Sequence, residues 1–143
     1  MENGSIEYEK ISIGTEQLPI EAKKVVVLGY EVKVVNNNEG KEIGNKLVLK
    51  VKHPDVPEME LSKVKYEKNK KLTESGLWIS KDKDGKIPFL SALAHLLRHY
   101  RYSNISDLKN KEIDTVIDEN GYVIAKAYWI KGLTALYFLI NWG

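Results

Sequence analysis

Residues 87–100 read IPFLSALAHLLRHY and carry the clearest helical pattern in the chain. Pro88 stands near the start of this segment, where a missing backbone N–H costs a helix little. Apolar side chains recur at helical spacing, so the segment predicts an amphipathic helix with one buried face. The residues of that predicted face are Phe89, Leu93, Leu96, Leu97 and Tyr100.

The chain before this helix alternates as β-strands do. Between Lys24 and Val35 every second residue from Val26 to Val34 is apolar, which predicts a half-buried strand. Residues 36–40 form a turn cluster rich in Asn, and a second alternating run follows and ends at His53-Pro54. We therefore expect a long hairpin at the start of the fold.

Residues 53–79 are less regular, because Pro54, Pro57 and several lysines interrupt them. Within this part Val64 and Tyr66 alternate with lysines, a pattern typical of a short edge strand. Residues 77–79 predict one more short strand before the helix.

The chain after the helix holds a strong hairpin signal. Residues 112–119 and 122–129 flank Asn120-Gly121, a dipeptide that suits both positive-φ positions of a type I′ turn. We therefore expect two antiparallel strands joined by that turn.

The predicted order of elements is strand, strand, strand, helix, strand, strand, as in an OB-fold, a five-stranded Greek-key barrel. Over about residues 24–128 the chain resembles small OB-fold nucleic-acid-binding proteins of archaea, their viruses and phages. The resemblance rests on the helix Phe89–Tyr100, on residues 105–113 that enter the fourth strand, and on residues 121–124 in the fifth strand. It implies an α+β, mainly antiparallel fold with one helix between strands three and four.

The length of 143 residues allows one domain with one core. We expect an acidic N-terminal arm over residues 1–21, which carry five Glu and one Lys. An OB-like domain is expected over residues 22–130, and an apolar C-terminal extension over residues 131–143. No secretory signal or membrane span of about 20 apolar residues is evident, which favours a cytoplasmic protein without a membrane partner.

Composition excludes several kinds of chemistry. The chain has no Cys, so disulfides, thiolate zinc sites and a cysteine nucleophile are ruled out. The net charge is only +2, too small to indicate a polyanion partner by itself. Almost all the basic residues are Lys, a bias typical of thermophilic proteins and also of AT-rich genomes.

The small net charge conceals a polarity along the chain. Residues 61–71 hold five Lys and one Glu, whereas residues 103–120 hold five acids and two Lys. An OB-fold binds single strands by stacking bases on aromatic side chains while lysines follow the phosphates. The leading prediction is therefore non-enzymatic binding of single-stranded DNA or RNA. The predicted binding residues are Tyr66, Trp78, Lys50, Lys52, Lys63, Lys65, Lys81, Lys83 and Lys86.

Enzyme and metal functions find weaker support. His95 and His99 have the i, i+4 spacing of zinc ligands, but the Glu that follows the first His in such motifs is missing. Residues 82–87 resemble the middle of a calcium loop, yet the first and twelfth positions lack carboxylates. We expect no metal, cofactor, small-molecule substrate or catalytic residue; a base at either His is the remaining enzymatic option.

The C-terminal segment suggests a rival function. Residues 129–142 present no polar face at any period, so they complete the chain's own core or bury against a second copy or another partner. In the second case the chain is a small protein–protein interaction or assembly protein, such as a viral one, and a homo-oligomer. The predicted interface residues are Trp129, Leu133, Leu136, Tyr137, Phe138, Ile140 and Trp142.

Overall fold

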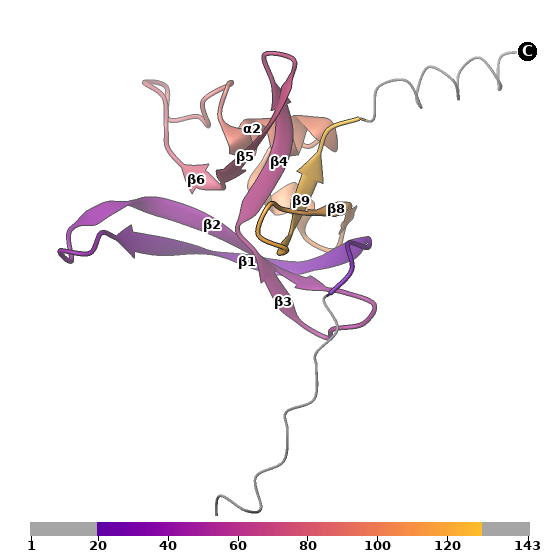
Figure 1. Cartoon of the computed structure of the whole chain (residues 1–143). Coiled ribbons are helices and arrows are strands. Elements are labelled where there is room, and N and C mark those ends of the chain that lie inside the picture. Colours follow the sequence, from indigo (N-terminus) through magenta and orange to yellow (C-terminus); the bar gives the residue numbers. More distant parts are fainter. Residues whose placement is uncertain (1–19, 130–143) are drawn as a thin grey trace, which may run out of the picture.

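The computed structural model describes residues 20–129, and Figure 1 shows how their elements are arranged. The strands are β1 (Val25–Asn36), β2 (Glu42–Lys52), β3 (Met59–Leu61), β4 (Lys63–Lys68), β5 (Lys71–Gly76), β6 (Trp78–Ile79), β7 (Glu112–Ile113), β8 (Thr115–Ile117) and β9 (Val123–Ala127). The helices are α2 (Ala92–His99) and the 3₁₀ turn η1 (Ile105–Leu108). The predicted arm (1–21) therefore lies almost wholly outside the described residues, as do the extension (131–143) and all predicted interface residues except Trp129.

The strand pairings follow one another around a barrel-like fold. In the first sheet β1 pairs with β2 and β7, and β2 also pairs with β3 and β6. In the second sheet the order is β5-β4-β9-β8, with β4 and β9 parallel and the other pairs antiparallel. Only Ser62 separates β3 from β4, and only Asp114 separates β7 from β8, so both sheets share two nearly continuous strands. The fold is mostly antiparallel β with one α-helix in the described part of the chain.

A β-bulge changes the buried face of β1. The register moves from Val27 opposite Val51 to Gly29 opposite Lys50, which leaves Leu28 as the extra residue. The alternation shifts by one there, because a strand has a side-chain period of two. Val25 and Val27 are buried, whereas most of the apolar set that the alternation predicts to face the core is exposed: Leu28, Tyr30, Val32 and Val34.

The region around β4 also differs from the sequence prediction. β4 is not an edge strand, because β5 pairs with one side of it and β9 with the other. Its hairpin with β5 turns at Asn69 and Lys70, which both have positive φ, at 52° and 66°. The alternating lysines of β4 suggest an edge strand, but they only mark the strand face opposite the buried Val64 and Tyr66.

The predicted helix is confirmed as α2, but α2 begins at Ala92, after the first residue of the predicted buried face, Phe89. Ser91 caps it, with its side-chain oxygen accepting the Ala94 N–H at 3.1 Å. Phe89 precedes the cap and is 71% exposed, so its place on the buried face is wrong. The buried residues of the helix are Ala92, Leu93, Ala94, Leu96 and Leu97.

The Tyr100 side chain, at the end of this helix, hydrogen-bonds two backbone groups of the second sheet and its border. Its hydroxyl donates to the carbonyl of Lys126 and accepts the N–H of Asp114, both at 2.8 Å. Asp114 is the residue between β7 and β8, so these bonds satisfy backbone groups where the strand is interrupted. Burial holds the pKa of Tyr100 well above its usual range, which keeps the hydroxyl protonated.

Three loops of the same design connect strands or precede the helix. In each, an Asn or Asp side chain accepts the N–H groups two and four residues later, and a Gly at the fourth position has positive φ. The side chains are those of Asn37, Asp82 and Asp118. The hairpin predicted at residues 112–129 is confirmed for β8 and β9, but its turn is of this kind and not type I′, because Asn120 has no positive φ.

The first described residues are fixed to the barrel by His53. This side chain is 1% exposed; its Nε2 lies 2.7 Å from the Glu21 carbonyl, and its Nδ1 accepts the Asp55 N–H at 3.0 Å. A neutral ring that donates from Nε2 satisfies both contacts.

No helix of residues 20–129 is long and apolar enough to cross a membrane.

Candidate functional site

Trp78 and Lys46 form the centre of the candidate site. They lie directly opposite each other in the β2–β6 ladder, and the Lys46 Nζ is 5.5 Å from the centre of the Trp78 ring. The Trp78 side chain is the only aromatic one on this short strand, and the residue is 39% exposed. A cation beside a half-exposed aromatic face combines a stacking surface with a positive charge.

Two glycines make room for this pair. A Cβ on Gly44 would lie 3.4 Å from two carbon atoms of the Trp78 ring, so the ring packs against the β2 backbone at Gly44. A Cβ on Gly76 would lie 2.8 Å from the Lys46 Cε and 2.9 Å from the Trp78 Nε1. The absence of a side chain at Gly76 thus allows the lysine and the indole to approach each other.

Lys63 adds a second positive charge to the site. Burial lowers the pKa of Lys46, and the positive charge of Lys63 lowers it further. Within residues 20–129 neither ammonium forms an ion pair with a carboxylate. Two neighbouring lysines without such partners repel each other, and an anion between them would relieve that repulsion.

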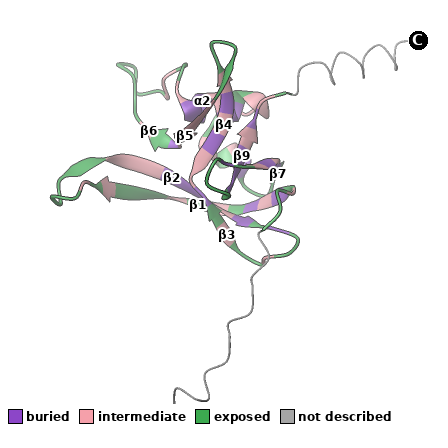
Figure 2. Cartoon of the chain, in the orientation of Figure 1, coloured by how far each residue is buried: buried purple, intermediate pink, exposed green. Residues whose placement is uncertain are grey.

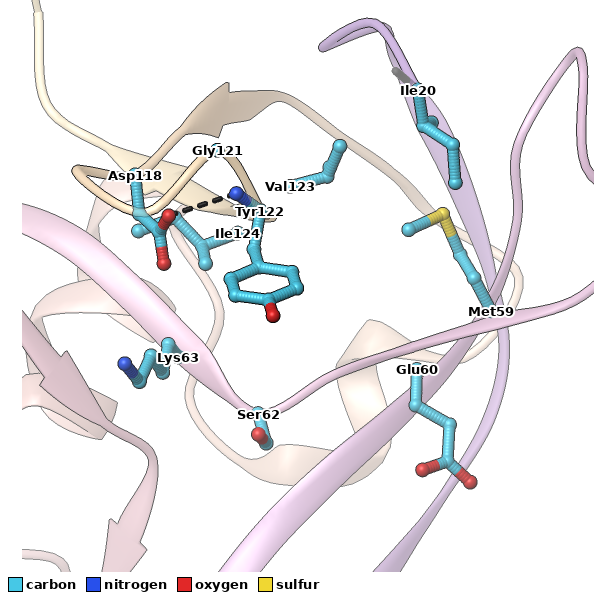
Figure 3. Close-up of a pocket in the computed structure, with 10 residues that line it drawn as sticks. All are labelled: Ile20, Met59, Glu60, Ser62, Lys63, Asp118, Gly121, Tyr122, Val123 and Ile124. Atoms are coloured by element: carbon cyan, nitrogen blue, oxygen red, sulfur yellow. Dashed lines mark hydrogen bonds between the residues drawn. The ribbon is translucent and has the colours of Figure 1, made fainter. Parts of the chain in front are cut away.

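A pocket of about 610 Å³ adjoins Lys63, and Figure 3 shows its lining. It lies between β3 and the β8–β9 turn, a part of the barrel where these strands are not paired. Tyr122 is 70% exposed and its ring projects into the pocket, with Lys63 to one side and Met59 to the other. Asp118 holds this turn by accepting the Tyr122 N–H at 2.8 Å. Lys63 thus lines the same pocket as Tyr122 and acts electrostatically on Lys46, the lysine beside Trp78.

The other predicted lysines lie in different surroundings. Lys65 pairs with Glu74 at 3.9 Å, and Lys50 is 4.0 Å from Glu31. Glu31 also pairs with Lys33, which pairs with Glu60 as well, so Lys50 shares its carboxylate partner with another lysine. The four remaining predicted lysines are exposed and lie at the end of β2 or in the loop after β6; they are Lys52, Lys81, Lys83 and Lys86.

Tyr66, which the sequence predicts to be an exposed binding residue, is buried. It is 5% exposed, belongs to the core cluster, and its ring centre lies 4.7 Å from that of His95 on α2. Its ring is therefore closed to a nucleobase, because the neighbouring helix covers it. The prediction that Tyr66 stacks a base is therefore wrong.

The two helical histidines contact aromatic rings. His95 lies against Tyr66, and His99 lies 4.3 Å from the ring centre of Trp129. Burial is the main cause that lowers the pKa of each imidazole. In the described part of the chain no three His, Asp or Glu side chains come together as a metal site. Trp129 is 67% exposed apart from its contact with His99.

Sequence reasoning missed Lys46 and Tyr122. Lys46 stands in an alternating strand like many solvated lysines, and only the ladder places it opposite Trp78. The alternating pattern of residues 122–129 predicts that Tyr122 begins a strand, whereas Tyr122 follows Gly121 in the third Asn/Asp-x-x-Gly loop. Recurrence of that loop pattern at residues 37, 82 and 118 is the signal that could have placed Tyr122 at a turn.

Comparison of the chain with protein-family models, with curated proteins and with solved structures finds no match.

Proposed function

We propose that this protein binds single-stranded nucleic acid through Trp78, Lys46, Lys63 and Tyr122. The observation that carries the proposal is the pair of lysines, without carboxylate partners in residues 20–129, beside the half-exposed Trp78 ring. Single-strand binding needs aromatic faces for bases and cations for phosphates, and this surface supplies both.

We propose further that the barrel is an OB-fold. Five strands are obtained when β3 and β4 count as the third, β7 and β8 count as the fourth, and β5 and β6 are treated as additions between the third strand and α2. Helix α2 then lies between the third and fourth strands. The pairing of β9 with β4, and of β7 with β1, supports a Greek-key closure. In an OB-fold the face of strands two and three, with the loops after strands one and four, binds oligonucleotides. Lys46, Lys63 and Tyr122 lie on those strands and in the second of those loops.

The arrangement suggests a path for the strand. One base would stack on Trp78 and another on Tyr122, and the phosphates between them would lie near Lys46 and Lys63. Each phosphate neutralised releases counterions, so affinity should fall as salt rises. No contact reads a base edge in this scheme, and we therefore propose binding with little sequence preference and without catalysis.

The test is fluorescence anisotropy of a labelled oligo-dT of about 30 nucleotides titrated with the full chain, with a duplex of the same length as control. Binding to the single strand that weakens steeply with salt, and exceeds binding to the duplex, supports the proposal. Absence of single-strand binding at low salt would overturn it.

A further inference from the structure

β1 has one long edge without a strand partner in residues 20–129. On this edge β7 pairs only with Val25 and Val26, and the last backbone bonds join Val27 to Lys111 and Asn110. From Leu28 to Asn36 the strand is hydrogen-bonded on its β2 side alone. Such an edge is a template for pairing with another strand.

The same part of β1 exposes apolar side chains. Tyr30, Val32 and Val34 share one face, since they lie opposite Leu49, Leu47 and Asn45 of β2. Val32 is 54% exposed, although Leu47 opposite it is fully buried, and Val34 opposite Asn45 is 57% exposed. Figure 1 shows the β1–β2 hairpin extending beyond the rest of the barrel, and Figure 2 shows exposed residues along it.

We propose that this edge pairs with the same edge of a second copy, so that two hairpins form one four-stranded antiparallel sheet around a two-fold axis. The free edge runs from residue 28 to residue 36, and its midpoint is Val32. A two-fold axis at Val32 brings the full length of both edges into register, as an isologous contact requires.

The side chains are self-complementary about this same midpoint. With Val32 opposite its own copy, Glu31 faces Lys33 of the second copy, and Lys33 faces Glu31 of the second copy. On the other face Tyr30 faces Val34 of the second copy, an aromatic and β-branched pair. The length of the free edge and the pattern of charges thus give the same centre independently, which is why we infer a second copy as the occupant.

Engineered cysteines test the proposal, because the native chain contains none. In the proposed sheet the two copies of residue 32 have Cα atoms about 5 Å apart, within disulfide range. The two copies of residue 34 are separated by four residues along the strand, or about 13 Å. Val32→Cys should therefore form a disulfide-linked dimer under mild oxidation, whereas the similarly exposed control Val34→Cys should form no disulfide between copies. Equal cross-linking of both variants, or of neither, would overturn the register.

Charge reversal tests the pairing without a covalent bond. Sedimentation of the wild type should show dimers that increase with concentration, in the absence of nucleic acid. Glu31→Lys and Lys33→Glu should each weaken self-association about tenfold, because each places like charges opposite one another. An equimolar mixture of these two variants restores both opposite-charge pairs and should form heterodimers. A wild type that is monomeric throughout, with the edge covered by another segment of its own chain, would overturn the proposal, as would a mixture no more associated than either variant alone.

Discussion

Lys46 and Trp78 face each other across the β2–β6 ladder, with the Lys46 ammonium 5.5 Å from the centre of the indole ring. The pair is 32 residues apart in the chain, and Gly76 leaves the space in which both side chains fit. Because burial and Lys63 both act against the charge of Lys46, the site carries an electrostatic cost in the absence of an anion. A lysine whose pKa is lowered in this way is a candidate for binding an anion.

Loss of the indole should weaken nucleic-acid binding. Trp78→Ala removes the stacking surface and should cost about 1 to 3 kcal/mol, which is about 5- to 150-fold in Kd for oligo-dT. Trp129→Ala is the matched control, because Trp129 is also exposed but lies beside His99. Equal Kd values for Trp78→Ala and the wild type would remove Trp78 from the site.

Lys46→Met should have opposite effects on binding and stability. One phosphate contact is lost, so Kd should rise and the salt slope should fall by about 1. The folded-state pKa of Lys46 is lowered, so the charged ammonium destabilises the fold below that pKa, and the penalty declines as pH rises through it. The variant should thus be at least as resistant to urea as the wild type at pH 7, with a difference that shrinks at alkaline pH. Lys109→Met, at an exposed position after η1, serves as the control.

Gly76→Ala should disturb the candidate site without replacing any of the residues proposed to contact nucleic acid. The added Cβ would meet the Lys46 Cε at 2.8 Å and the Trp78 Nε1 at 2.9 Å, and both contacts are too short, so both side chains or the strand itself must shift. We expect weaker oligo-dT binding and a changed Trp fluorescence spectrum. Gly29→Ala is the matched control, because Gly29 also lies in a strand without a positive φ and nothing lies within 4 Å of its added Cβ. Wild-type affinity in Gly76→Ala would show that the close approach of Lys46 and Trp78 is unnecessary.

Tyr122→Ala should reduce affinity and leave stability unchanged. The residue is 70% exposed, so little core is lost, whereas a base loses its platform at the pocket. Asp118→Ala should instead destabilise the fold, because the Asn120 and Tyr122 N–H groups lose their acceptor. Thermal melts and anisotropy measured on both variants distinguish the two roles; a Tyr122→Ala variant that binds as the wild type does would exclude the pocket from the interface.

Tyr100→Phe should test the connection between the helix and the barrel. The change leaves the Lys126 carbonyl and the Asp114 N–H without their shared partner, at a cost of about 1 to 3 kcal/mol in unfolding free energy. The folded-state pKa of Tyr100 is raised, so its contribution is present below the usual tyrosine pKa of about 10 and is lost as pH rises above it. Urea melts between pH 7 and pH 11 should show a loss of stability in the wild type that is smaller in Tyr100→Phe.

Much of the fold could be predicted from local pattern. The alternation in residues 24–35, the apolar spacing of α2 and the hairpin around Gly121 are set by near neighbours, and all three are present. The bulge at Leu28 could not be predicted, because it depends on how β1 meets β2 and Lys111. The parallel pairing of β4 with β9 is equally non-local, and without it the lysines of β4 suggest an edge.

The candidate site was predictable only in part. Trp78 and Lys63 stood out because an aromatic residue and lysines occur together in a basic segment. Tyr66 has the same local pattern, yet α2 covers it, and no pattern in its own strand reveals the helix. Lys46 joins the site through a ladder that spans more than 30 residues, which the spacing of nearby residues does not encode.

The most direct test of the proposed interface is ultraviolet cross-linking of oligo-dT to the full chain, followed by mass spectrometry of the linked peptides. Bases stacked on aromatic rings cross-link to them, so the account predicts adducts at Trp78 and Tyr122 and none at the buried Tyr66. Adducts confined to other residues, or bound oligonucleotide without an adduct at Trp78 or Tyr122, would contradict it.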